Sequence, residues 1–194
     1  MMNVFISMLR GVNVGGHHKV KMDELRTLYE SLGLSDVQTY VQSGNVLFAT
    51  QQREFDRLAV EIEKAIEQRC GFHADVILLN VSELRDVVRR NPFATRQDIA
   101  PNKLLVTFLS RDPGQEARDK VLAMKIGPEE LSFGAHEYYV HFPNGAGNSK
   151  LPTAAIERAL KTPGTARNWN SVTRMLELAE SMGAQLAPDS QPQV

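Results

Sequence analysis

The pattern of apolar and polar positions predicts a regular alternation of strands and helices. Short apolar runs rich in β-branched and aromatic residues are typical of strands. Apolar residues that recur at helical spacing predict amphipathic helices between them. In the first part of the chain the predicted strands cover 4–9, 37–41, 45–49 and 74–79, and the helices cover 22–32 and 55–69. The element order is therefore β-α-β-β-α-β.

The same order follows once more after a connecting helix over 81–90. The second set comprises strands at 103–109, 131–133, 138–142 and 165–168, with helices at 115–123 and 151–160. A closing helix over 171–182 is expected to end at Gly183. The two halves share no visible sequence similarity, so only the order of elements repeats.

Each half matches the ferredoxin-like split βαβ unit. We therefore predict an α+β fold of two tandem ferredoxin-like βαββαβ units with antiparallel sheets, plus a connecting helix and a C-terminal helix. Strands one and three of each unit should be central. The predicted division is 1–80 for the first unit, 81–101 for the connection, 102–186 for the second unit with its closing helix, and 187–194 for a flexible tail.

This topology brings distant loops together. In the first unit, segments 10–16, 42–45 and 70–73 should lie at one end of the sheet, and we expect direct hydrogen bonds between the first two through Asn13 or Asn45. In the second unit, 144–150 and 167–170 should also share an end. If the units pack in inverted fashion, both groups of loops would line one cleft.

Composition narrows the class of protein. The chain has 194 residues and a formal net charge of -1, which argues against broad nucleic-acid binding because that requires a basic surface. The lone Cys70 permits no intramolecular disulfide, which fits a reducing compartment. No signal peptide is evident, and no apolar run approaches the roughly 18 residues of a membrane span. We expect a cytoplasmic protein that is a monomer or a homodimer.

The Gly-rich loop 10–16 is the first candidate site. Gly11 and Gly16 have the spacing of a P-loop, but His17-His18 replace the Lys and Ser/Thr that nucleotide hydrolysis requires. A looser anion site would use the N–H groups of Gly15 and Gly16. The cationic side chains Arg10 and Lys19 would then complete this site. The alternative is a structural turn in which Asn13 bonds backbone groups and the glycines adopt positive φ.

Three further segments carry candidate residues. The stretch Gln42-Ser43-Gly44-Asn45 is first a hairpin turn, with a functional role only if it lies beside the Arg10 loop. Arg167-Asn168-Trp169-Asn170 precedes a helix, where Asn170 or Ser171 is a candidate cap and the N-terminus attracts anions. Trp169 is either a core anchor or a stacking surface. Lys150 ends a Gly-rich loop that either closes over a ligand or is an ordinary connection.

Two other chemistries are less favoured. Cys70, His73, His17 and His18 should lie at one end, but no CxxC, HExxH or acidic cluster accompanies them, so we predict no metal site and leave any cofactor unassigned. RNA recognition by stacking needs aromatics on the exposed sheet face, and strand 45–49 offers only Phe48. A nucleic-acid partner is therefore not expected.

Several motifs resemble those of a bacterial family known only as domain of unknown function 1697. The matching stretches are Leu9–Gly16, Lys19–Met22, Thr39–Val46, Asn148–Leu151 and Thr165–Ser171. His17-His18 and Lys21 depart from the Lys-Asn-like residues and Pro expected there. The resemblance implies paired ferredoxin-like units over nearly the whole chain and implies no activity.

The leading hypothesis is an uncharacterised protein that binds a small anionic or phosphate-bearing ligand at its Gly/Asn-rich loops. The alternatives are a non-enzymatic interaction or homo-oligomerisation module and an enzyme with an unrecognised active site. The candidate ligand-binding residues are Arg10, Asn13, Gly15, Gly16, Lys19, Gln42, Ser43, Gly44, Asn45, Lys150, Arg167, Asn168, Trp169 and Asn170.

Overall fold

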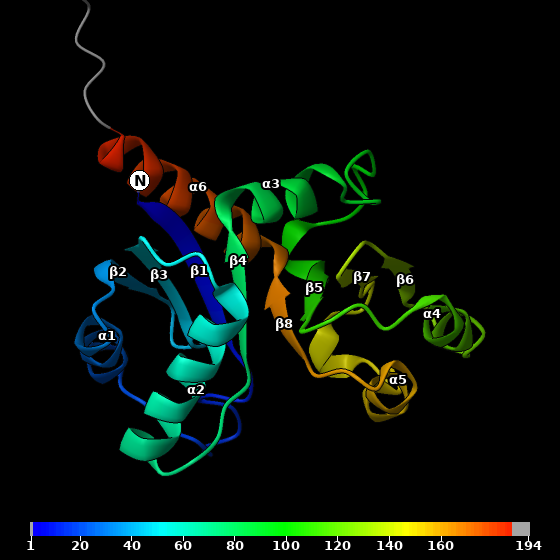
Figure 1. Cartoon of the computed structure of the whole chain (residues 1–194). Helices are drawn as coiled ribbons and strands as arrows, with labels where there is room; N and C mark the ends of the chain where they lie inside the picture. The colour runs from blue at the N-terminus through cyan, green and yellow to red at the C-terminus, as the bar shows by residue number, and fades with distance from the viewer. Residues whose placement is uncertain (1, 188–194) are drawn as a thin grey trace, which may run out of the picture. The chain divides into compact units, whose positions relative to one another are not determined.

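The computed structural model describes residues 2–187, and the chain divides into two compact units (Figure 1). The first unit comprises the described residues up to Ser82 together with those from Arg174 onward, and the second comprises Glu83–Thr173. The tail expected over 187–194 lies outside the described residues except for Ala187.

The first unit has the predicted βαββαβ order. Its elements are β1 (Asn3–Leu9), α1 (Met22–Ser31), β2 (Ser35–Tyr40), β3 (Asn45–Thr50), α2 (Phe55–Cys70) and β4 (Val76–Asn80). The strands form one antiparallel sheet in the order β2-β3-β1-β4, which confirms that the first and third strands are central. Gly33 follows α1 with a positive φ of 77°, the left-handed conformation in which helices commonly end.

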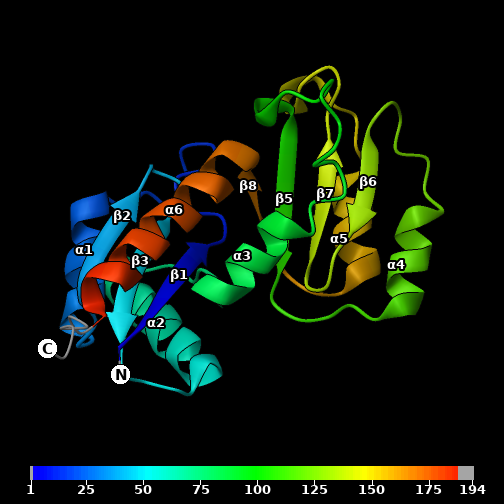
Figure 2. The ribbon, with the colours of Figure 1, turned by 90° about the horizontal axis from the view of Figure 1, so that it is seen from above.

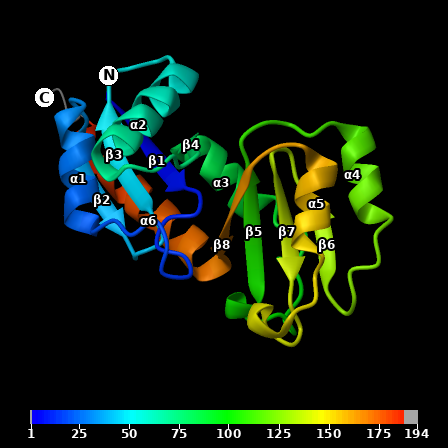
Figure 3. The ribbon, with the colours of Figure 1, turned by 90° about the horizontal axis from the view of Figure 1, so that it is seen from below.

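Both faces of the first sheet are buried. Helices α1 and α2 cover one face, where Phe5, Tyr29 and Phe48 belong to the main apolar cluster. Ile6 and Leu47 are fully buried on the opposite face, because side chains alternate along a strand. From Arg174 onward, α6 (Trp169–Leu186) covers that face, as Figures 2 and 3 show from the two sides.

The C-terminal helix differs from expectation in where it ends and in the unit that it contacts. It runs through Gly183 to Leu186 rather than ending at Gly183. Gly183 lies close to β1, since a Cβ built on it would be 4.0 Å from Val4 Cγ2. From Arg174 onward α6 also belongs to the first unit by its contacts, whereas the sequence-based division grouped the whole helix with the second unit.

The second unit repeats the sheet order after the connecting helix α3 (Val81–Arg89). Its elements are a short 3-10 turn η1 (Pro101–Lys103), β5 (Leu104–Leu109), α4 (Gln115–Leu122), β6 (Glu130–Phe133), β7 (Glu137–His141), η2 (Ala146–Asn148), α5 (Thr153–Leu160) and β8 (Gly164–Asn168). The antiparallel order is β6-β7-β5-β8, so β5 and β7 are central as expected. The α+β class with two such sheets is confirmed.

The two faces of the second sheet differ in polarity. Tyr138 and Val140 of β7 face the apolar cluster that includes Val121 of α4 and Ile156 of α5. The alternate residues of β7, Glu137, Tyr139 and His141, point to the other face and are also buried. On that face, Tyr139 Oη donates a 2.7 Å hydrogen bond to the carbonyl of Val87 and so fixes α3 to the sheet.

Candidate functional site

Backbone hydrogen bonds gather the predicted loops at one end of the first sheet. The Leu9 N–H donates to the Gly44 carbonyl at 2.8 Å, and the Arg10 N–H donates to the Asp75 carbonyl at 2.9 Å. The loop after β1 therefore touches both the β2–β3 turn and the segment before β4. The approach to the β2–β3 turn is the one that the antiparallel topology predicted, whereas the contact before β4 is at Asp75, two residues beyond the predicted segment 70–73.

Asn13 fastens the Arg10 loop to its own returning arm and to the neighbouring β2–β3 turn. Its Nδ2 donates to the carbonyls of Val20 at 3.0 Å and Gln42 at 2.9 Å, and its Oδ1 accepts from the Val20 N–H at 2.9 Å. The bond to Gln42 confirms the predicted contact between the two loops. Because all three bonds go to the backbone, the contacts of Asn13 match the structural role considered above.

The β2–β3 turn is held in a similar way by Asn45. This side chain is fully buried, and its Nδ2 donates to the Tyr40 carbonyl and to Ser43 Oγ. Gly44 has a φ of +70°, and a Cβ at this position would lie only 2.9 Å from Leu9 Cβ. Asn45 and Gly44 thus shape the turn and let the two loops approach closely.

Val41 is a feature that the sequence analysis missed. It adopts a φ of +50° in the turn, although β-branched residues rarely occupy the left-handed region, and 48% of its surface is exposed. Such strain persists only where the surrounding structure imposes it, and it is concentrated at functional sites. No sequence signal identifies it, because the Ser43-Gly44 pair satisfies the usual hairpin rule by itself.

Arg10 faces a carboxylate rather than standing as an open cationic arm. Its NH1 lies 3.5 Å from Asp75 Oδ2, and His73 Nε2 lies 3.5 Å from the other oxygen of the same carboxylate. All three side chains are partly or largely exposed to solvent. Asp75 therefore reduces the positive field that the sequence assigned to Arg10, without burying the charge.

The tip of the Arg10 loop is a tight two-residue turn. The His17 N–H donates to the Val14 carbonyl at 3.0 Å, and the two residues form an isolated antiparallel bridge. Gly15 and Gly16 between them have φ values of +58° and +81°, as a type I′ turn requires at both positions. Within residues 2–187, the N–H groups of these two glycines donate to no protein acceptor.

The ring of one histidine at this end stacks on an aromatic side chain, and the cysteine thiol is partly buried. The ring of His18 stacks on Phe72 with centroids 4.4 Å apart, and burial raises the pKa of the Cys70 thiol, which disfavours the nucleophilic thiolate. Among the described residues, no three His, Cys, Asp or Glu side chains gather closely enough to hold a metal ion.

The candidate residues of the second unit are largely engaged in local contacts. Arg167 is buried, its NH1 donates to Thr165 Oγ1 at 2.7 Å, and burial lowers its pKa to about 10. Asn168 Oδ1 accepts from the Asn170 N–H at 3.0 Å, so Asn168, rather than Asn170 or Ser171, caps α6. The helix starts at Trp169, earlier than predicted, which places the cap earlier too.

The remaining two candidates of the second unit are accessible. Trp169 is half-buried at the first turn of α6, between the two alternatives considered for it. Lys150 is exposed in the loop between η2 and α5. Neither side chain makes a polar contact with another candidate residue within the described part of the chain.

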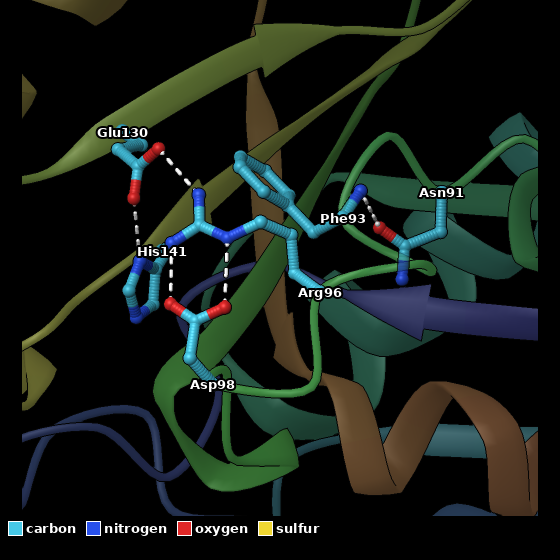
Figure 4. Close-up of polar contacts among 6 residues, drawn as sticks. All are labelled: Asn91, Phe93, Arg96, Asp98, Glu130 and His141. Atoms are coloured by element: carbon cyan, nitrogen blue, oxygen red, sulfur yellow. Dashed lines mark hydrogen bonds and ion pairs between the residues drawn. The ribbon is translucent and has the colours of Figure 1, made fainter.

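A charged network that the sequence analysis missed lies in the second unit. Figure 4 shows Arg96 between Asp98 and Glu130, with Glu130 in turn bonded to His141. These residues come from the loop after α3, from β6 and from β7. Their separation in sequence hides the network, and only the pairing of β6 with β7 brings Glu130 opposite His141.

Comparison with known proteins identifies the family. The family model DUF1697, which is described as a protein of unknown function, matches residues 2–139. This is well over half of the chain. The chain belongs to the DUF1697 family. The match spans all the motifs of the first unit and ends two residues before His141. No curated protein matches the sequence.

A solved structure shares the fold of this family member. It is a conserved bacterial protein, SP0830, from Streptococcus pneumoniae, with a TM-score of 0.70 and 24% sequence identity. The similarity covers 92% of this chain and 99% of that chain. The comparison therefore shows the fold.

No helix in the described residues is long and apolar enough to cross a membrane.

Proposed function

We propose that the chain binds a small anion, such as inorganic phosphate or the phosphate group of a metabolite, at the tip of the Arg10 loop. The observation that carries the proposal is the pair of consecutive N–H groups at Gly15 and Gly16 that donate to no protein acceptor in the described residues. Both glycines are exposed, so an anion can reach them. Successive N–H groups in a turn form a concave site for anions.

The rest of the loop supports this proposal by holding the tip in place. Asn13 closes the loop onto Val20 and onto the neighbouring turn, so the two N–H groups are fixed before a ligand arrives. Preorganisation of this kind raises affinity because less conformational entropy is lost on binding. Exposed Lys19 lies on the returning arm of the loop and supplies a cation.

Arg10 has a secondary role in this proposal. Its 3.5 Å contact with Asp75 is long for an ion pair, and both side chains are partly exposed, so the pair adds little stability. An anion at the tip would compete with Asp75 for Arg10. We therefore expect Lys19 to contribute more to binding than Arg10 does. A cytoplasmic location is part of the same proposal, in keeping with the single cysteine.

Titration with inorganic phosphate at low salt tests the proposal. In amide NMR spectra, we expect the Gly15 and Gly16 signals to shift saturably. Lys19→Ala should weaken binding about tenfold, equivalent to ~1.4 kcal/mol. Lys64→Ala, which removes an exposed cation of α2, is the matched control and should bind as the wild type does. Phosphate that leaves both glycine amides unmoved would rule out this site.

A second candidate function is interaction with another protein or with a second copy of the chain. Val14 is 64% exposed at the loop tip, and Val41 is 48% exposed in the adjoining turn. Two exposed aliphatic side chains on loops joined by the Asn13–Gln42 bond favour an apolar contact. Sedimentation across protein concentrations distinguishes this function, because Val14→Ser would then lower any association without altering phosphate binding.

A further inference from the structure

His141 combines burial with a fixed orientation. Its side chain is only 7% exposed, and its Nδ1 lies 3.0 Å from Glu130 Oε1. The two residues are paired opposite each other in the β6–β7 ladder, so the backbone sets their spacing. A polar ring that is more than nine-tenths buried normally has partners for its polar atoms. Whether the second ring nitrogen, Nε2, has a hydrogen-bond partner therefore bears on the role of His141.

Glu130 is held as a carboxylate by a second partner. Arg96 NH1 donates to Glu130 Oε2 at 2.8 Å, while Arg96 Nε and NH2 donate to the two oxygens of Asp98 at 2.9 Å and 2.6 Å. The hydrogen bond from Arg96, followed by that with His141, lowers the pKa of Glu130. Glu130 is thus a pure acceptor at neutral pH, with one oxygen for each neighbour.

An ionised Glu130 dictates the tautomer of a neutral His141. Because the carboxylate only accepts, the imidazole proton must reside on Nδ1, and Nε2 carries the lone pair. Figure 4 shows the second ring nitrogen pointing away from Glu130. Within residues 2–187, Nε2 has no hydrogen-bond partner. The network therefore presents one oriented proton acceptor that no protein donor uses.

We propose that this network is an acid–base site in which Nε2 of His141 accepts a proton from water or from a hydroxyl group of a neutral substrate. Glu130 is the positioning residue for the ring, and Arg96 with Asp98 positions Glu130. This site is separate from the anion site proposed for the first unit.

The charges of the network favour a neutral substrate. Arg96 is opposed by two carboxylates, Asp98 and Glu130, so the site with a neutral His141 carries one net negative charge and repels anions. Phe93, whose ring centroid lies 6.3 Å from that of His141, adds an apolar surface. The Phe93 N–H donates a 2.9 Å hydrogen bond to Asn91 Oδ1, which holds the backbone at Phe93 in place.

Hydrolysis of p-nitrophenyl acetate, a neutral ester, provides the probe. As the oxygen of water bonds to the ester carbonyl carbon, Nε2 takes one of its protons, and the bond to p-nitrophenolate breaks. The products are p-nitrophenolate and acetic acid, which ionises to acetate by releasing its own proton to water, and His141 returns the proton on Nε2 to solvent. We expect His141→Gln to lower the protein-dependent rate at least tenfold. His136→Gln, which removes an exposed histidine from the β6–β7 turn, should leave the rate unchanged.

The Glu130→Gln variant distinguishes a positioning role of Glu130 from a general contribution to folding. This variant should lower the rate and shift the midpoint of the pH–rate profile, because the Nδ1–H loses its charged acceptor. Nitrogen-15 NMR of the folded wild type gives an independent readout and should show the proton on Nδ1. A His141→Gln rate equal to that of the wild type, or a proton on Nε2 in the wild type, would overturn the assignment.

Discussion

The two units share a strand order but organise their loop-bearing ends by different means. In the first unit, the amides of Asn13 and Asn45 bond backbone carbonyls, and glycines supply the left-handed turns. In the second unit, charged side chains from separate elements meet in a network around Arg96. The loop end of the first unit therefore exposes backbone N–H donors at Gly15 and Gly16. The loop-bearing end of the second unit carries the oriented side chain of His141.

This difference sets the chemistry available at each end. Exposed N–H groups and nearby cations suit a small anion, which needs several donors and no proton transfer. An imidazole held by a carboxylate suits acid–base chemistry, because one nitrogen is fixed and the other is left to exchange a proton. The two proposed sites thus rest on the same βαββαβ frame, which is expected where function depends on loops rather than on fold.

The largest expected effect concerns the close approach of the two loops in the first unit. Gly44→Ala places a Cβ 2.9 Å from Leu9 Cβ and forces an alanine into the left-handed region. We expect the free energy of unfolding to fall by about 3 kcal/mol. Gly16→Ala is the control, since its φ is also positive but no atom lies within 4 Å, and it should cost only about 1 kcal/mol. Equal losses in urea unfolding would refute the packing argument.

The next effect tests whether the amide of Asn13 organises the first end. Asn13→Ala removes three hydrogen bonds to the backbone and should lower stability by about 2 kcal/mol. The amides of His17 and Val20 should then exchange with solvent much faster in hydrogen-exchange measurements. Gln42→Ala keeps the carbonyl that Asn13 uses, so its stability should stay within about 0.5 kcal/mol of wild type. Unchanged exchange in Asn13→Ala would show that the loop is held by other contacts.

The smallest effect concerns the charged network of the second unit and depends on pH. Hydrogen bonds from Arg96 lower the pKa of Asp98 to about 2, below its unfolded value of about 4. The stabilisation is present above pH ~4 and is lost as the pH falls toward 2, because protonation then breaks the pair. Arg96→Gln should therefore lower the melting temperature clearly at pH 7 and much less at pH 2.

Arg10→Gln is the matched control in the first unit. Its 3.5 Å contact with Asp75 is longer than the 2.6–2.9 Å bonds of Arg96, so its loss should change the melting temperature less at pH 7. If the two substitutions have equal effects, the contrast between the two ends does not extend to their charges.

The sequence by itself determined the element order, the two sheets and the convergence of the first-unit loops. Apolar periodicity defines strands and helices locally, and an antiparallel βαββαβ order then leaves few ways to place the loops. The sequence also singled out Asn13 as a residue that bonds backbone groups and Gly44 as a turn residue that tolerates positive φ. It misplaced the end of α6, since Gly183 is normally a stop signal and in the structure lies inside the helix, close to Val4 of β1.

Only the tertiary structure decided which contacts and conformations the side chains adopt. Arg10 lies against Asp75 rather than standing as an open cationic side chain. Val41 adopts a strained conformation that no local rule predicts. The network of Arg96, Glu130 and His141 joins residues up to 45 positions apart through strand register and a loop, neither of which leaves a motif. Local patterns determine elements because their energetics are local, whereas charged contacts across elements depend on distances that only the folded chain sets.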